Sequence, residues 1–324
     1  MKWLGAKLLL ATMIVTAFTN VSRAETPIDP SLPVFTPSEK TTGKITVGGS
    51  MTMAQLAAIW ADTFKKQAPG VEFELVAQGS TNAIPALIEG KSDFALLSRP
   101  ISEQEFKAFQ DKFGYAPTVV VPALEQIAIY VHKDNPIESI TPAQLDAIFS
   151  KTLKRGATQT ASTWGDLGVK GDLASKPVVV QGRRDETGLQ VYFQAVVLLG
   201  GEYRDDMIEN QSSIDLIKGI TSNPGSIGFG GAAMANPDIK AVPLVLQEGQ
   251  EPLAVNTPGY PLVRPLQIIV NHAPGKELTG AEGEFYKFIF SQRGQQDVII
   301  GGLVPISARP AQIALEAVGL KTLN

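Results

Sequence analysis

Apolar residues recur along the first third of the chain at two alternating spacings. Short runs of continuous or every-second apolar positions predict strands, and runs with apolar positions three and four apart predict helices. The two patterns alternate as Ile45–Val47, Thr52–Gln67, Phe73–Val76, Thr81–Gly90, Asp93–Leu97, Ser102–Phe113 and Thr118–Val121. This alternation favours an α/β fold with a parallel sheet covered by helices on both faces. Ligands of such sheets bind beyond the carboxyl ends of the strands.

The predicted strand-to-helix turns are rich in glycine and hydroxyl residues. They are Gly48–Thr52 after the first strand, Gln78–Thr81 after the second, and Gly182–Gly188 between a strand at Val178–Val180 and a helix at Leu189–Leu199. Glycine permits the backbone angles of a tight turn, and a helix N-terminus presents unpaired N–H groups with partial positive charge. Three such turns predict a site for an oxyanion.

Two apolar, extended segments, Gln126–His132 and Leu266–His272, lie between the alternating units. We interpret them as strands that cross between two lobes and act as a hinge around a ligand-binding cleft. The fold class predicted is therefore α/β, with two Rossmann-like lobes joined by two crossing strands. The predicted division is a signal peptide over 1–24, a linker over 25–42, lobe I over 43–125 plus 267–324, and lobe II over 126–266.

The N-terminal segment has the features of a secretion signal. Lys2 and Lys7 precede an apolar run over Leu8–Phe18, and Ser22-Arg23-Ala24 fits a small-residue cleavage site. Cleavage before Glu25 is expected, which predicts an exported protein.

Charge and composition narrow the function. The chain has a net charge of −4, and removal of Lys2, Lys7 and Arg23 leaves 25 basic against 32 acidic residues, a net −7. No general basic field gathers nucleic acid, so an anion must be recognised by local donors. There is no cysteine, which excludes disulfides and thiol catalysis. The two histidines, His132 and His272, show no metal-ligand spacing, so neither a metal nor a cofactor is expected.

The order of these motifs resembles the periplasmic phosphate-binding proteins of bacterial ATP-driven (ABC) phosphate transporters. The resemblance spans most of the chain after the signal peptide. The matching segments are Gly49–Thr52 with Trp60–Phe64, Gln78–Thr81, Asp93–Arg99, Gly182–Gly188, and Asn223–Phe229.

This resemblance implies a type II periplasmic binding protein that captures inorganic phosphate and delivers it to a membrane ABC permease, as a monomer and without catalysis. Arg183 would clamp the anion, because its planar fork matches two phosphate oxygens, and Asp185 would orient Arg183. The implied phosphate-binding residues are Ser50, Met51, Thr52, Gly79, Ser80, Thr81, Ser98, Arg99, Arg183, Asp185, Thr187 and Gly188.

Alternatives stay open at the level of sequence. Ser98 stands where the best-known members carry an aspartate, which predicts weaker discrimination against sulfate. Sulfate or molybdate is therefore an alternative ligand, and sensing or adhesion an alternative use of bound phosphate. A phosphatase with Ser50, Thr52 or Thr187 as nucleophile is a further alternative, although no base is visible beside them.

Overall fold

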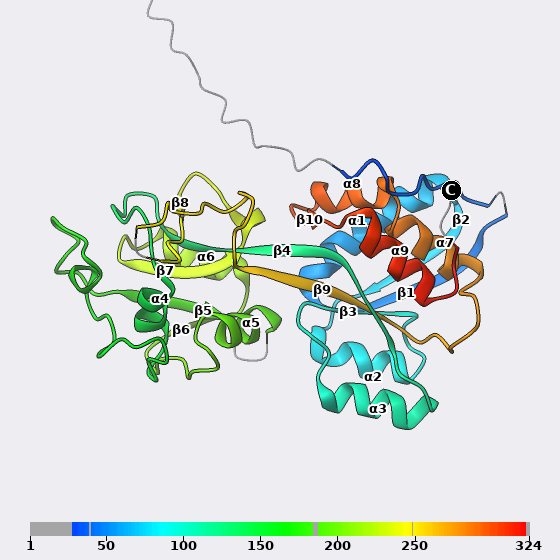
Figure 1. The fold of residues 1–324 in the computed structure, drawn as a ribbon, viewed down its shortest axis with the longest axis horizontal. Helices are drawn as coiled ribbons and strands as arrows, with labels where there is room; N and C mark the ends of the chain where they lie inside the picture. The colour runs from blue at the N-terminus through cyan, green and yellow to red at the C-terminus, as the bar shows by residue number, and fades with distance from the viewer. Residues whose placement is uncertain (1–27, 39, 184–186, 248, 322–324) are drawn as a thin grey trace, which may run out of the picture.

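The computed structural model describes residues 28–38, 40–183, 187–247 and 249–321. The predicted signal peptide and Asp185 lie outside these residues. Two bodies, lobe I and lobe II, are joined by β4 (Thr118–His132) and β9 (Val263–Val270), which run side by side between them (Figure 1). Among the described helices, none combines the length and apolarity needed to cross a bilayer.

Lobe I is built from both ends of the chain (Figure 1). Its strands β1, β2 and β3 are mutually parallel, and β9 joins the sheet antiparallel to β3. Its elements are β1 (Thr42–Gly49), α1 (Met51–Gln67), β2 (Gly70–Val76), η1 (Ser80–Asn82), α2 (Ala83–Ile88), β3 (Phe94–Leu97), α3 (Glu103–Phe113), α7 (Gly280–Ile289), α8 (Gln292–Ile300), β10 (Val304–Pro305) and α9 (Ala308–Ala317).

The strands of lobe I are buried on both faces. Phe94 and Leu96 belong to a core shared with α1, α7 and α9, whereas Ala95 and Leu97 belong to a second core shared with α2 and α3. Because successive strand residues point to opposite faces, a strand covered on both sides is apolar throughout.

Lobe II repeats the two-faced arrangement. Ile127, Ile129 and Val131 of β4 face a core with α4 and α5, while Ala128 and Tyr130 face a core with α6. Its elements are α4 (Pro142–Phe149), η2 (Trp164–Leu167), β5 (Val179–Arg183), α5 (Gly188–Val196), β6 (Ile208–Asn210), α6 (Ser213–Thr221), β7 (Ser226–Gly231), η3 (Ala232–Met234) and β8 (Ile239–Val242).

The predicted fold class is confirmed, with two differences in the sheet. The expected strands over 118–121 and 126–132 are one strand, β4, whose register with β9 shifts between Val120 and Ala123. The sheet is mixed rather than parallel, because β4 and β9 pair antiparallel with each other and with their neighbours.

Two of the predicted domain boundaries fall inside strands. The division after Glu125 and after Leu266 stays a prediction; both residues lie inside the strands that run between the lobes. Within the predicted linker, Leu32 and Phe35 are buried in the core of lobe I, and Asp29 accepts a hydrogen bond from the Ala308 N–H (2.8 Å). Residues 28–38 therefore pack on lobe I, because two apolar side chains suffice to anchor a segment without periodicity.

Candidate anion-binding site

The first predicted turn joins β1 to α1. Gly49 has a φ of +125°, and a Cβ there would lie 2.4 Å from the Leu96 carbonyl oxygen, so only glycine fits. Ser50 is the N-cap: its hydroxyl oxygen accepts a hydrogen bond from the Met53 N–H (3.4 Å), and its own N–H donates to Leu96 O (2.9 Å). The next residues are Met51, which is exposed, and Thr52, which is half-buried. This turn aims the first N–H groups of α1 beyond the end of the sheet.

The turns that follow β2 and β3 meet the first turn. The Gly79 N–H donates to Gly49 O (2.9 Å), and Ser80 follows at the start of η1. The Ser80 hydroxyl accepts a hydrogen bond from the Ser98 N–H (3.2 Å) and lies 3.4 Å from the Ser98 hydroxyl. Both serines are buried, whereas Thr81 is exposed. The carboxyl ends of β1, β2 and β3 therefore converge on two neighbouring hydroxyl groups.

The turn predicted over Gly182–Gly188 reaches this place from lobe II. Thr187 caps α5 by accepting a hydrogen bond from the Gln190 N–H (3.3 Å), and Gly188 is the first residue of the helix. A Cβ on Gly188 would lie 2.6 Å from the Ser98 hydroxyl oxygen and 2.7 Å from the Ser98 carbonyl oxygen. The backbone of the α5 N-terminus thus packs directly on Ser98 of lobe I, and the absence of a side chain permits the contact.

Arg183, the predicted clamp, lies at the end of β5. Its guanidinium donates to the Ser213 hydroxyl (2.9 Å) and to Gln211 O (3.1 Å). Its Nε is buried without a hydrogen-bond partner in the part of the chain that the structure describes. Burial lowers the pKa of Arg183, and the nearby Asp215 carboxylate opposes that shift. The side chain is therefore half-buried and tied to the start of α6.

Arg99 is held at the edge of the site. Its two terminal nitrogens donate to the two oxygens of Glu105 (2.8 and 2.7 Å). Burial raises the pKa of Glu105, but hydrogen bonds from Arg99 and Ser102 outweigh it and leave that pKa below its ordinary value. The fork of Arg99 is thus occupied by a carboxylate of α3.

Sequence reasoning missed Arg264, which is 2% exposed on β9. Its Nη1 donates to Ser98 O (2.8 Å), and its Nη2 lies 3.5 Å from the Thr52 hydroxyl. The available signal was a single arginine just before the apolar run that begins at Leu266. The predicted strand began too late to include it.

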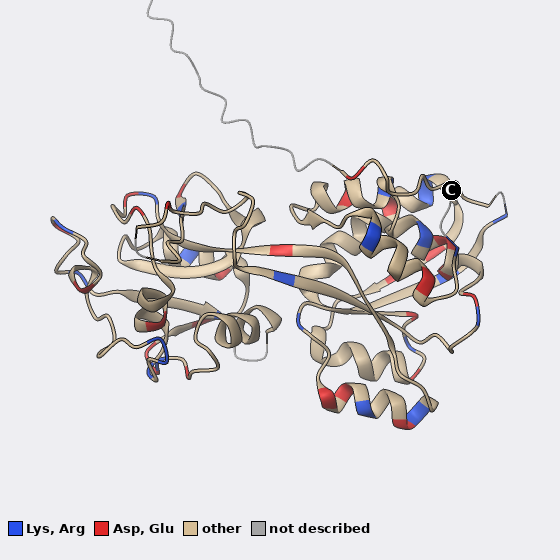
Figure 2. Cartoon of the chain, in the orientation of Figure 1, with Lys and Arg blue, Asp and Glu red and all other residues tan. Residues whose placement is uncertain are grey.

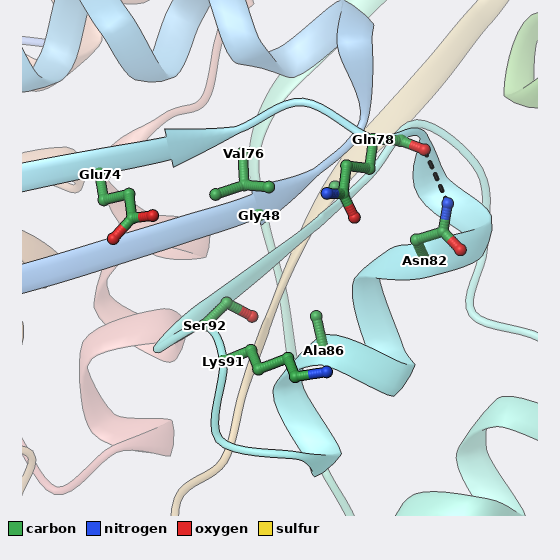
Figure 3. Close-up of a pocket in the computed structure, with 9 residues that line it drawn as sticks. Gly48, Glu74, Val76, Gln78, Asn82, Ala86, Lys91 and Ser92 are labelled. Carbon is green, nitrogen blue, oxygen red and sulfur yellow. Dashed lines mark hydrogen bonds between the residues drawn. The ribbon is translucent and has the colours of Figure 1, made fainter.

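A cavity of about 330 Å³ lies beside the first turn but away from these hydroxyls. Its polar side chains come from β2, the segment from Gln78 to η1 and the segment before β3, and the Gln78 side chain points into it (Figure 3). Lys91 pairs with Glu89, and Glu74 pairs with Lys44. Ser92 Oγ is buried there without a partner among the described residues. None of the predicted phosphate-binding residues is among those that line the cavity, so we do not assign the anion to it.

Comparisons with known proteins agree with this architecture. A family profile described as "PBP superfamily domain" matches residues 36–293. A protein from Clostridium perfringens solved with bound phosphate superposes with a TM-score of 0.65 at 25% identity, covering 82% of this chain and 100% of that one. An ABC-type phosphate transport receptor from Vibrio cholerae shares the fold, with a TM-score of 0.62 at 20% identity, over 82% of this chain and 100% of its own. The chain belongs to the PBP superfamily, a class of solute-binding proteins rather than enzymes.

The sequence comparison gives the particular family. The phosphate-binding protein PstS of Pseudomonas aeruginosa is 38% identical over 320 residues, which cover 97% of this chain and 99% of the relative. The protein of the same name from Bacillus subtilis is 25% identical over 273 residues, 83% of each chain. Within the superfamily, this chain belongs to the PstS family.

The contact between Gly188 and Ser98 predicts the effect of a single methyl group. In Gly188→Ala we expect the clash to push the lobes apart, because Ser98 is fixed on lobe I by Ser80 and Arg264. Small-angle X-ray scattering should give a larger radius of gyration than for the wild type. The control is Gly301→Ala, where the new Cβ would make ordinary contacts of 3.4 and 3.5 Å. Scattering that is unchanged in Gly188→Ala, at unchanged stability, would contradict the contact.

Proposed function

We propose that this protein captures inorganic phosphate between its two lobes and delivers it to a membrane ABC permease. The observation that carries the proposal is the convergence of Ser80, Ser98 and Gly188 at one point where both lobes meet. Its relatives carry the name phosphate-binding protein, which supports phosphate as the ligand.

The energetics are sufficient without a metal. Micromolar affinity corresponds to about 8 kcal/mol. Hydrogen bonds to a charged group contribute about 1.5–3 kcal/mol each before ordering costs are counted. The proposed donors are the hydroxyls of Ser50, Thr52, Ser80, Ser98 and Thr187, the N–H groups of Met51, Thr81 and Gly188, and the guanidinium of Arg183. Three or four of these contacts made together reach that range. The Gly79 N–H already donates to Gly49 O, so the proposed part of Gly79 is to shape the turn.

The roles of the remaining predicted residues are narrower. Arg99 already pairs with Glu105, so its proposed part is to add positive potential at the rim rather than to clamp the anion. Asp185, the proposed partner of Arg183, lies outside the described residues. A monomer is the proposed state in solution.

Arg183 supplies the first test of the proposal. Calorimetry on phosphate-stripped wild type should show phosphate binding, and Arg183→Ala should weaken it by several kcal/mol while the fold remains intact. Arg183→Lys should recover only part of the loss, because lysine lacks the two-pronged fork. The control is Arg155→Ala, which removes a half-buried arginine that donates to Val196 O and Val197 O elsewhere in lobe II. Wild type that gives neither heat nor thermal stabilisation at millimolar phosphate would refute the function. Normal binding in Arg183→Ala would refute only the clamp.

Ser98 supplies a test of selectivity. Sulfate carries no proton at neutral pH, so a carboxylate facing the anion rejects it, whereas a hydroxyl does so less strongly. We therefore expect measurable sulfate competition in the wild type. In Ser98→Asp, sulfate affinity should fall more than phosphate affinity. Equal effects on the two anions would show that residue 98 does not face the ligand.

Export is the last part of the proposal. The positively charged start and apolar run of residues 1–24 support secretion, with the functional chain beginning at Glu25. N-terminal sequencing of the protein recovered from outside the cytoplasmic membrane should begin at Glu25. An intact Met1 there would show an uncleaved anchor instead.

A further inference from the structure

The two strands that run between the lobes carry a buried ion pair. Glu125 of β4 and Arg264 of β9 are directly paired in the antiparallel register. Both the Nε and the Nη2 of Arg264 contact Glu125 Oε2, at 2.6 and 2.5 Å. Figure 2 shows the acidic segment of β4 beside the basic segment of β9 where the strands leave lobe I. The charged groups are 2% and 10% exposed, so water screens them little.

The Arg264 guanidinium also reaches toward the candidate anion site. Its Nη1 donates to the carbonyl of Ser98, and its Nη2 lies near the Thr52 hydroxyl. Ser98 lies in the turn after β3, and Thr52 lies in the first turn of α1, directly after β1. The guanidinium therefore holds the backbone of Ser98, the residue that also contacts Ser80 and Gly188.

Two elements of lobe II close around the same pair. Burial raises the pKa of Tyr192 on α5 to about 12, and the charge of Arg264 opposes that rise, so the phenol lies within electrostatic reach of the guanidinium. A Cβ at Gly231 of β7 would lie 2.3 Å from Glu125 Oε1, so the carboxylate fits against bare backbone there. The pair thus contacts Ser98 of lobe I through Arg264 and the backbone of β7 in lobe II through Glu125.

We propose that Arg264 is a second positioning residue for the bound anion and that Glu125 sets how much of its charge the anion experiences. This inference rests on the proposed phosphate-binding function. Without ligand, Glu125 balances the buried charge of Arg264. An anion beside Ser98 and Thr52 is attracted by Arg264 and repelled by Glu125, so the two residues act on its affinity with opposite sign.

The opposite signs of the two expected effects on phosphate affinity distinguish this role from a purely structural one. A purely structural ion pair is broken by either substitution, so both variants would bind more weakly. In our proposal Arg264→Gln weakens phosphate binding about tenfold, whereas Glu125→Gln strengthens it about tenfold, because a unit charge across several Å of partly buried protein has at least this effect. Glutamine at position 125 keeps one oxygen that can accept from Arg264 and replaces the other with an uncharged NH2 group, so the negative charge is lost.

The experiment is calorimetric titration of phosphate-stripped wild type, both single variants and the double variant Glu125→Gln/Arg264→Gln. The double variant leaves no unpaired buried charge and should bind with an affinity between those of the two single variants. Asp297→Asn is the matched control: Asp297 is another buried carboxylate facing an arginine, Arg293 (3.0 Å), near Thr63 in the C-terminal half of α1. It should bind phosphate within about twofold of wild type, because an ion pair more than a Debye length away has little effect.

The outcomes separate the two proposals. Wild type that binds phosphate, with Glu125→Gln tighter than wild type, supports the role of the pair. Wild type that binds, with Glu125→Gln equal to or weaker than wild type, overturns it and leaves the proposed function standing. Wild type that does not bind phosphate overturns both. If Arg264→Gln fails to fold, the sign of the Glu125→Gln effect decides alone.

Discussion

The buried pair of Glu125 and Arg264 constrains how the two halves of the chain are joined. Burying each ion costs several kcal/mol, and good geometry is needed to offset that cost. Here one carboxylate oxygen receives two donors, and the Ser98 carbonyl receives a third. A shift of one residue between β4 and β9 would place the two charges on opposite faces of the sheet. The pair therefore fixes the register of the strands that position one lobe against the other.

The position of Ser98 also depends on this ion pair. Its carbonyl is held by Arg264 on β9, its N–H by Ser80 on lobe I, and its side chain is covered by the backbone of Gly188 of lobe II. A residue fixed from three directions presents its hydroxyl in one orientation. Preorganisation of this kind lowers the entropy cost of binding, because the donor does not have to be ordered by the ligand.

Local signals in the sequence predicted much of the fold. The helix predicted over Ser102–Phe113 is α3, which begins at a capping box formed by Ser102 and Glu105; such a cap depends only on residues three apart. The turns at Gly49 and Gly79 were also predicted from local sequence, because glycine readily adopts the positive φ angles found at both positions. Their convergence at the end of the β1–β3 sheet followed from the alternation of strands and helices.

Features that depend on distant residues were not predicted. Two strands were predicted, over 118–121 and 126–132, but pairing with β9 continues on both sides of the register shift and makes β4 a single strand. The bidentate contact of Arg99 with Glu105 depends on a side-chain direction that spacing does not give. Arg264 was missed because its partner lies 139 residues earlier in the chain. Ion pairs between distant segments leave no periodic trace in either segment.

The balance of charges explains why the candidate site depends on short-range contacts. With a net charge of −4, the protein as a whole repels anions, and salt confines the field of any exposed residue to about 10 Å. Attraction must therefore arise from groups that act over a few ångströms: helix N-termini, hydroxyls, and arginines shielded from water. Arg264 meets this requirement only because Glu125 allows its charge to be buried. The same carboxylate that allows Arg264 to be buried between the lobes also limits its attraction for an anion, so stability and affinity are coupled through Glu125.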